Sequence, residues 1–205
     1  MSNILLVTSS PRGSESLSSK FAGQLADKLQ SLSPGGAIVH RDLGAAPIPH
    51  LDAVSTAAIR KPADARTPEE AAAAAYSDQL VAELLHADTL IIATGLINFS
   101  IYSTLKSWID NVARAGLTFK YTETGPVGLA TGKKAYVVLS SGGVYSAGSN
   151  AANDHAIPYL KTILGFLGVT DIEVLYLEGL AYGPEAAEKA TQALQSKISA
   201  LSLAA

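Results

Sequence analysis

Short unbroken runs of apolar residues alternate along the chain with longer segments in which apolar residues recur every three or four positions. Five runs predict strands: residues 4–7, 37–43, 89–94, 134–139 and 172–177. The segments after them predict helices: residues 17–32, 68–85, 105–112, 158–166 and 184–201. The run at residues 37–43 contains His40, Arg41 and Asp42, which indicates a partly exposed strand.

This alternation predicts an α/β fold, because parallel strands need a crossover connection between them. We expect a five-stranded parallel sheet with helices on both faces, and five strands fit the order 2-1-3-4-5, which the sequence alone does not fix. Residues 46–68 and 119–131 are predicted as irregular insertions, the first with a short helix near residues 53–59. No linker or internal repeat interrupts the chain, so residues 1–205 are predicted to form a single domain.

The composition excludes several kinds of protein. With 48% hydrophobic and 16% charged residues, the chain can bury a sizeable core. Its net charge of −3 is too small to direct it to nucleic acid or to an anionic membrane. It contains no cysteine, which excludes disulfides, thiolate nucleophiles and sites in which cysteine binds zinc or iron–sulfur clusters.

Further absences in the sequence narrow the chemistry. The four histidines show neither HxxxH nor HExxH spacing, so no metal site is expected, and no GxSxG sequence marks a hydrolase nucleophile. The apolar run at residues 4–7 is too short for a signal peptide or a membrane span. We therefore expect a cytoplasmic protein that does not enter a membrane.

The loops after the first, third and fourth strands are expected to form the binding site. In an open parallel sheet, ligands bind at the carboxyl ends of the strands, where the strand order reverses. In the order 2-1-3-4-5 this point lies between strands 1 and 3. The loops to consider are therefore residues 9–16, 95–101 and 140–145.

The first loop, SSPRGSESLSS at residues 9–19, contains six serines, one arginine and one glycine between a buried strand and a helix. Serine hydroxyls and the unpaired amides of a helix N-terminus together suit a phosphate monoester. GxGxxG and GxxxxGK[ST] are both absent, so neither the usual dinucleotide loop nor a nucleoside triphosphate loop is indicated. The alternative is a serine-rich loop with an ordinary helix cap, which composition alone does not exclude.

The other two loops carry weaker signals. Asn98 and Phe99 could set an amide and an aromatic ring beside a flat heterocycle, although in isolation a turn asparagine and a core phenylalanine are favoured. Gly142 and Gly143 leave backbone amides bare and let the edge of a ring approach. A tight turn is the simpler explanation of these glycines when they are taken alone.

Taken together, these segments resemble the bacterial FMN-dependent NADH azoreductases, within the flavodoxin-like quinone reductases. The resemblance covers nearly the whole chain. Its most specific segments are SSPRGSESLS at 9–18, RDLGAAPIP at 41–49, NFSI at 98–101, LKSWIDNVARAGLTFKYTETGPVGL at 105–129, TGKKAYVVLSSGG at 131–143, PYLKTILGFLGVTDI at 158–172 and EGLAYGP at 178–184. It implies a flavodoxin-like fold.

The resemblance also implies an activity. It points to an enzyme with non-covalently bound FMN that reduces azo compounds and quinones with electrons from NADH or NADPH, in a two-electron ping-pong cycle. It implies a homodimer with active sites at the interface, and no nucleic acid or membrane partner. The flavin carries the hydride chemistry, so no protein residue is expected to be an obligatory acid or base.

Site residues follow from the resemblance position by position. The family holds the FMN phosphate at the positions of Ser10, Ser16, Leu17 and Ser18. It holds the isoalloxazine ring at the positions of Leu96, Ile97, Asn98, Phe99, Ser140, Ser141, Gly142 and Gly143. The substrate side of the cleft is expected to be lined by Tyr121, from the partner subunit, and by Tyr145.

Three places depart from the family pattern. Residues 95–97 read Gly-Leu-Ile where many members carry Pro-Met-Tyr, Ser141 replaces an arginine, and Tyr145 replaces a histidine. These changes leave open the choice between NADH and NADPH and the physiological electron acceptor. Two alternatives also stay open: a flavodoxin-like electron carrier that serves a protein partner, and a scaffold that has lost FMN. The two insertions and the mild charge argue against the carrier.

Overall fold

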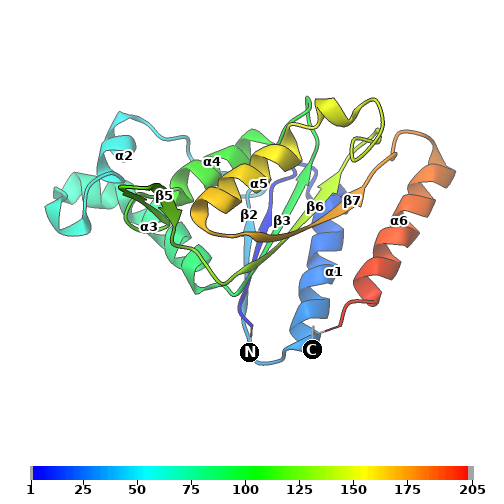
Figure 1. Ribbon diagram of the computed structural model, residues 1–205, viewed down its shortest axis with the longest axis horizontal. Helices are drawn as coiled ribbons and strands as arrows, with labels where there is room; N and C mark the ends of the chain where they lie inside the picture. Colours follow the sequence, from blue (N-terminus) through cyan, green and yellow to red (C-terminus); the bar gives the residue numbers. More distant parts are fainter. Residues whose placement is uncertain (1, 203–205) are drawn as a thin grey trace.

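The main element of the fold is a sheet of five parallel strands in a computed structural model that describes residues 2–202. The strands are β1 (Ile4–Thr8), β2 (Ile38–Asp42), β3 (Thr89–Gly95), β6 (Lys134–Ser140) and β7 (Asp171–Leu177). They lie in the order β2-β1-β3-β6-β7, and each neighbouring pair is parallel (Figure 1). The predicted five-stranded parallel sheet is confirmed. Its strand numbers run past five because a separate hairpin intervenes in the chain.

Helices cover both faces of this sheet, as the sequence predicted. One face carries α1 (Leu17–Leu32) and α6 (Pro184–Ser199). The other carries α3 (Pro68–His86), α4 (Ser103–Val112) and α5 (Ala156–Leu167) (Figure 1). This arrangement leaves the carboxyl edge of the sheet free for loops.

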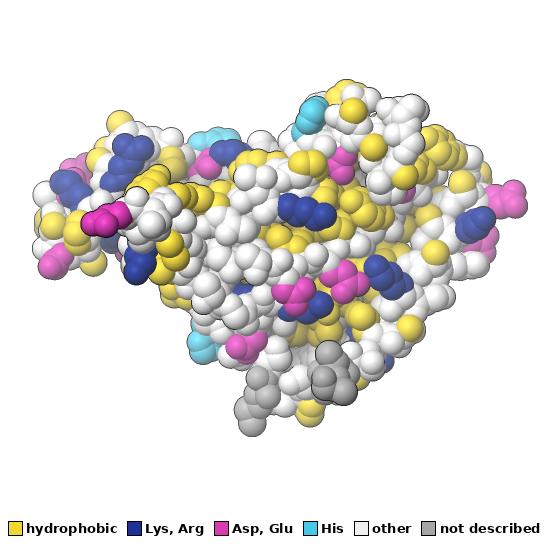
Figure 2. Space-filling view, in the orientation of Figure 1, with side chains coloured by type: hydrophobic (Ala, Val, Ile, Leu, Met, Phe, Trp, Pro, Cys, Tyr) yellow, Lys and Arg dark blue, Asp and Glu magenta, His cyan; other side chains and the backbone are white. Residues whose placement is uncertain are grey.

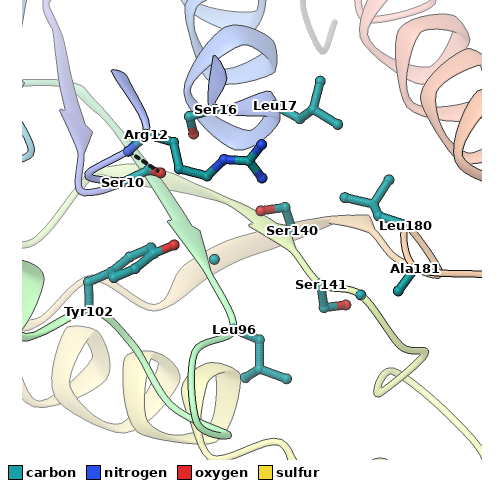
Figure 3. A pocket seen from close by; sticks show the side chains of 12 residues that line it. Ser10, Arg12, Ser16, Leu17, Leu96, Tyr102, Ser140, Ser141, Leu180 and Ala181 are labelled. Carbon is teal, nitrogen blue, oxygen red and sulfur yellow. Dashed lines mark hydrogen bonds between the residues drawn. The ribbon is translucent and has the colours of Figure 1, made fainter. Parts of the chain in front are cut away.

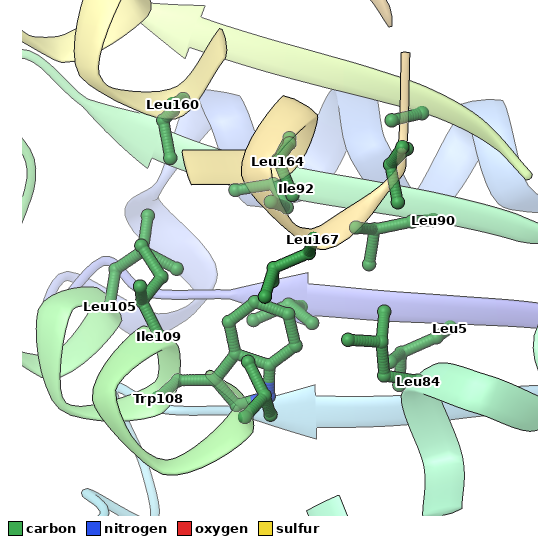
Figure 4. Packing of buried hydrophobic residues seen from close by; sticks show 14 of the residues in the cluster. Leu5, Leu84, Leu90, Ile92, Leu105, Trp108, Ile109, Leu160, Leu164 and Leu167 are labelled. Atoms are coloured by element: carbon green, nitrogen blue, oxygen red, sulfur yellow. The ribbon is translucent and has the colours of Figure 1, made fainter. Parts of the chain in front are cut away.

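The sheet divides the core into two clusters, because successive side chains of a strand point to opposite faces. On β1, Leu5 and Val7 pack beneath α3, α4 and α5, whereas Ile4 and Leu6 face α1 and α6. Figure 4 shows the first cluster, in which the fully buried Trp108 lies among leucines and isoleucines of the sheet and its covering helices. Burial of each such side chain stabilises the fold by roughly 1.5–3 kcal/mol.

Side-chain caps fix where the helices begin. The Thr67 hydroxyl accepts a hydrogen bond from the amide of Glu70 at 3.2 Å, and the Glu70 carboxylate accepts one from the amide of Thr67 at 3.0 Å. This capping box starts α3 where the sequence predicted it. The start of α5 was predicted at Pro158 and lies two residues earlier, at Ala156. The reason is the Asp154 carboxylate, which accepts hydrogen bonds from the first two amides of the helix at 2.8 and 3.0 Å.

The segment 119–131 was predicted as irregular, and this prediction was wrong. It contains an antiparallel hairpin of β4 (Phe119–Thr122) and β5 (Gly125–Gly128). The ring of Phe119 packs against that of Phe166 in α5, with centroids 4.5 Å apart, which fixes the hairpin on the helix. The remaining side chains of the hairpin are largely exposed.

The insertion at residues 46–68 contains the predicted short helix, α2 (Ala53–Ala58), and projects from one end of the sheet (Figure 1). Two arginines hold it. The buried Arg114 donates from Nε to the carbonyl oxygen of Ile59 at 2.9 Å. Arg66 donates from Nε to the carbonyl oxygen of Ala58 at 3.0 Å. These contacts satisfy the backbone at the end of α2.

The surface carries no single block of charge on the face shown in Figure 2, where acidic and basic side chains are mixed. This agrees with the weak net charge of −3. Among residues 2–202, no helix combines the length and the apolar character needed to cross a bilayer.

Candidate active site

A cavity of about 320 Å³ lies at the carboxyl edge of the sheet, between the loops that follow β1, β3, β6 and β7 (Figure 3). Its size is in the range of small-molecule and cofactor sites. It is lined by Ser10, Arg12, Ser16, Leu17, Gly95, Leu96, Tyr102, Ser140, Ser141, Gly142, Leu180 and Ala181.

One end of the cavity is the N-terminus of α1. The hydroxyl of Ser16 accepts a hydrogen bond from the amide of Ser19 at 3.3 Å and lies 3.2 Å from the hydroxyl of Ser18. The amides of Leu17 and Ser18 have no acceptor within residues 2–202. Free amides at a helix N-terminus, together with the helix dipole, favour a bound anion. This end therefore fits a phosphate group.

Arg12 adds positive charge to the same end. Its side chain extends into the cavity beside Ser10 and Ser16 (Figure 3). Its backbone amide donates to the Ser10 hydroxyl at 3.3 Å, but its guanidinium makes no hydrogen bond or ion pair with any residue that the structure describes. An arginine without an acidic partner beside free amides is suited to a phosphate.

The other end of the cavity is formed by the glycine loop after β6. The carbonyl oxygens of Ser141, Gly142 and Gly143 accept hydrogen bonds of 2.9–3.2 Å from the amides of residues 179–181. The amides of Gly142 and Gly143 themselves have no acceptor in the described part of the chain. A Cβ at Gly142 would lie 3.2 Å from Cβ of Ala181, so a side chain there would crowd this wall. The loop offers bare donors to the edge of a flat ring.

The loop after β3 contains a strained turn. Ile97 and Ser100 exchange two backbone hydrogen bonds of 2.9 Å, and between them Asn98 and Phe99 have φ of 46° and 68°. Two central residues with positive φ are the signature of a type I′ turn, in which glycine is favoured. Asparagine tolerates this region, whereas phenylalanine does so at a cost, and such strain is often found at functional sites.

Replacing Phe99 by glycine is therefore expected to raise the free energy of unfolding by up to about 1 kcal/mol, since a left-handed conformation costs a residue with Cβ roughly 1–2 kcal/mol. The gain is reduced by the lost contact of the Phe99 ring, which is 48% exposed. Urea unfolding of the apoprotein measures the change. A fall of more than 1 kcal/mol in the free energy of unfolding would show that the contacts of the Phe99 ring stabilise the protein more than the backbone strain destabilises it.

Tyr145 does not line the cavity, but its ring lies next to the glycine loop, 3.0 Å from the position of a Cβ at Gly143. Its ring meets that of Phe99 edge-on, with centroids 6.3 Å apart. The Glu178 carboxylate accepts hydrogen bonds from the amides of Tyr145 and Ser146 at 2.7 and 2.9 Å, and this fixes the loop. Tyr145 is thus held between Phe99 and the glycine loop.

The structure brings most of the predicted site residues together. Those that line the cavity are Ser10, Ser16, Leu17, Leu96, Ser140, Ser141 and Gly142. Those that do not line it are Ser18, Ile97, Asn98, Phe99 and Gly143, each of which is within three positions of a lining residue in the sequence. Ser18 is buried, and its hydroxyl contacts that of Ser16, which lines the cavity.

Sequence reasoning missed five lining residues: Arg12, Gly95, Tyr102, Leu180 and Ala181. Arg12 and Gly95 lie inside the loops expected to form the site, and Tyr102 directly follows one of them. Nothing in the sequence shows which way the side chains of Arg12 and Tyr102 point. Leu180 and Ala181 belong to the EGLAYGP segment, whose part in the site depends on pairing with the glycine loop.

Tyr121 does not line this cavity. Its side chain is 74% exposed on β4, and it borders a separate hollow of about 460 Å³ together with Arg60 and Phe119.

Residues 2–202 contain no cluster of histidine, aspartate and glutamate side chains suited to a metal ion. The cavity therefore offers phosphate donors at one end and bare amides at the other, which suits a phosphorylated flat heterocycle.

Comparison with known proteins agrees with this geometry. The family model described as a flavodoxin-like fold matches residues 2–201. A protein of Agrobacterium fabrum named FMN-dependent NADH:quinone oxidoreductase is 69% identical over 205 residues, covering 100% of both chains. A protein of the same name from Mesorhizobium japonicum is 51% identical and covers 97% of this chain and 95% of its own.

Solved structures show the same similarity. The crystal structure of an azoreductase from Bacillus anthracis strain Sterne superposes with a TM-score of 0.87 at 31% identity, over 97% of each chain. An FMN-dependent NADH-azoreductase from the Ames Ancestor strain, solved in complex with FMN, has a TM-score of 0.85 at 28% identity, over 97% of this chain and 98% of its own.

Proposed function

Because this chain belongs to the flavodoxin-like family of FMN-dependent NADH:quinone oxidoreductases, we propose that it is an enzyme that uses FMN to reduce quinones and azo compounds with NADH or NADPH. The observation that carries the proposal is the cavity itself, with an anion site at the N-terminus of α1 and free amides in the glycine loop. Both ends match the chemistry of FMN, a phosphorylated flat heterocycle.

The residues of the site have separate tasks. Ser10, Ser16 and Arg12 hold the phosphate, and Leu96 with the glycine loop holds the ring. Bound FMN supplies the two-electron chemistry, taking a hydride from NAD(P)H and passing electrons to an acceptor. The bare amides of Gly142 and Gly143 would donate to the edge of a bound ring, where as fixed dipoles they would stabilise negative charge. Donor and acceptor would use the same cleft in turn, which is a ping-pong order.

Steady-state kinetics with FMN-reconstituted protein test this function. NADH and NADPH are each supplied with a quinone and with an azo dye, and no other protein is added. We expect turnover with both acceptors. An electron carrier would turn over neither acceptor without its protein partner, and a scaffold without an FMN site would not take up the yellow flavin at all.

The phosphate site is tested by the double substitution Ser16→Ala/Ser18→Ala. Loss of hydrogen bonds to a charged group costs about 1.5–3 kcal/mol. We therefore expect the Kd for FMN to rise at least about 10-fold, measured by quenching of flavin fluorescence. Ser31→Ala is the matched control, because Ser31 lies in the last turn of the same helix and its hydroxyl donates only to the carbonyl of Lys28. A change of less than about threefold in the double variant would remove these serines from the site.

The proposal includes a homodimer located in the cytoplasm. Support for the dimer comes from exposed apolar side chains on the hairpin and α2, of which Tyr121, Val127 and Val54 are 74%, 42% and 42% exposed. The neighbouring apolar residues Ile48 and Phe119 are buried in the chain's own core and give no support. In the dimer, Tyr121 reaches the substrate side of the partner's cleft.

Tyr121→Arg is expected to shift the protein from dimer toward monomer in analytical ultracentrifugation at micromolar concentration, because a charge would be buried in the interface. Lys120→Arg on the same strand keeps the surface charge and serves as control. A monomeric wild-type protein would contradict the dimer.

A further inference from the structure

The Tyr102 hydroxyl is a polar group in the cavity that has no task in the function proposed above. Tyr102 precedes α4, and its side chain points into the middle of the cavity (Figure 3). The hydroxyl makes no hydrogen bond with any residue between 2 and 202. A phenol that lies in a cavity without a protein partner is available to a ligand.

The room for this ring is made by Gly95, at the end of β3. A Cβ added at Gly95 would lie 3.1 Å from the Tyr102 hydroxyl oxygen and 3.3 Å from a carbon of its ring. Any residue with a side chain at position 95 would therefore press on the ring where it now lies. Gly95 and Tyr102 therefore form a complementary pair, because the Tyr102 ring occupies the space that a side chain at position 95 would need.

A second hydroxyl faces the same place. The Ser140 oxygen would lie 3.5 Å from that Cβ, on the other side of Gly95, and it also has no hydrogen-bond partner in the described residues. Tyr102 and Ser140 thus put two free hydroxyls in the middle of the cavity. In Figure 3 they lie between Ser10 and Arg12 at one end and Leu96 and Ser141 at the other.

We propose that Tyr102 binds the polyhydroxyl ribityl chain of FMN, in the space that Gly95 leaves open. This inference rests on the proposed FMN site and adds a positioning residue to it. The ribityl chain joins the phosphate to the ring, so it lies in the middle of the cavity when the two ends are held as proposed. Its hydroxyls both donate and accept, as do those of Tyr102 and Ser140.

The proposed contact of Tyr102 with the ribityl chain differs from the phosphate contact in the charge of the residue that makes it. Arg12 is a free cation at the phosphate end, whereas Tyr102 is a neutral phenol that lies on the opposite wall from Ser140. A neutral hydrogen bond is little affected by salt, whereas attraction between an exposed arginine and a phosphate is screened. The two residues should therefore respond differently to ionic strength.

The first test is titration of apoprotein with FMN at low and high salt. Tyr102→Phe keeps the ring and removes only the hydroxyl, and we expect the Kd to rise about 3- to 10-fold by the same factor at both salt concentrations. Arg12→Gln should weaken binding at low salt and less so at high salt. Tyr159→Phe is the matched control, because Tyr159 lies half-buried on α5 outside the cavity. An unchanged Kd for Tyr102→Phe, or a loss that disappears at high salt, would overturn the proposal.

The second test is a double-mutant cycle on FMN affinity. Gly95→Ala should weaken binding at least about fivefold in the wild-type background, because the new methyl group displaces the Tyr102 ring. In the Tyr102→Ala background the same change should cost less than about twofold, since the displaced ring is absent. Equal losses in the two backgrounds would overturn the pairing of Gly95 with Tyr102.

These outcomes are distinct from failure of the proposed function. If the wild-type apoprotein did not bind FMN, the cofactor assignment itself would be wrong. If the wild type binds FMN and Tyr102→Phe binds it equally well, the cofactor site stands and only the role of Tyr102 is removed. Circular dichroism of each variant confirms that a change in affinity is not a change in folding.

Discussion

Replacing Asp78 by asparagine is expected to lower the free energy of unfolding of the apoprotein by about 3 kcal/mol at pH 7. Asp78 is the acidic partner of two guanidinium groups: Arg66 at 2.5 Å and Arg114 at 2.9 Å, whose side chains are only 5% and 2% exposed. Removing one partner of a buried ion pair leaves an uncompensated charge and typically costs 3–5 kcal/mol. The Asp78 side chain is 39% exposed, so water offsets part of the loss and the lower value applies.

The same contacts make this contribution depend on pH. Burial acts to raise the pKa of Asp78, but hydrogen bonds and charge attraction from Arg66 and Arg114 outweigh it, so the pKa lies below the ordinary carboxyl value. The native state therefore binds this proton more weakly than the unfolded state. The stabilisation is fully present above the unfolded pKa of about 4 and is lost as the pH falls through the lower native pKa.

Urea unfolding of the wild type and of Asp78→Asn at pH 7 and at pH 3 measures the effect. The difference between their free energies of unfolding should be smaller at pH 3. Asp110→Asn is the matched control. Asp110 pairs with Lys106 on the surface of α4, with side chains 41% and 49% exposed, and such pairs contribute less than about 1 kcal/mol. Equal losses for the two variants would show that the arginines at Asp78 need no counter-charge.

The parts of the fold that the sequence predicted are those with strong local signals. Continuous apolar runs identify strands that are covered on both faces, such as β1 and β6. The hairpin gave no such signal, because its strands have four residues each, and β5 contains two glycines and a proline. It forms because Phe119 packs on α5, a contact between distant parts of the chain.

The residues of the site also differ in whether a local sequence signal predicts them. The serine cap of α1 and the glycines after β6 are local features, so Ser16 and Gly142 could be predicted from composition and position. Tyr102 could not, because its direction depends on the space at Gly95, seven residues earlier. The glycine loop itself is shaped by hydrogen bonds from residues 179–181, which turn its carbonyl oxygens away from the bare amides. No local pattern records that pairing.

Replacing Gly44 by alanine is expected to disturb the phosphate end of the cavity from outside it. Gly44 follows β2, and a Cβ at this position would lie 2.2 Å from the carbonyl oxygen of Ser10 and 3.0 Å from its carbonyl carbon. Both are backbone atoms, so no side chain can rotate away. The clash must move either the loop after β2 or Ser10 itself, which lines the cavity.

We expect the free energy of unfolding to fall by about 3 kcal/mol, at the upper end for forced overpacking. We also expect the Kd for FMN to rise more than about 30-fold, which corresponds to about 2 kcal/mol of binding energy. Unfolding in urea and quenching of flavin fluorescence measure the two effects on the same preparation.

Two variants separate the local effect on the cavity from the general loss of stability. Gly23→Ala is the matched glycine substitution: it lies inside α1, a Cβ there meets nothing within 4 Å, and it should stabilise the helix by about 1 kcal/mol without changing FMN affinity. Asp78→Asn should lose as much stability as Gly44→Ala, but Asp78 is not among the residues that line the cavity, so its Kd should stay within about twofold of wild type. If Gly44→Ala bound FMN as well as Asp78→Asn does, the position of the Ser10 backbone would not determine phosphate binding.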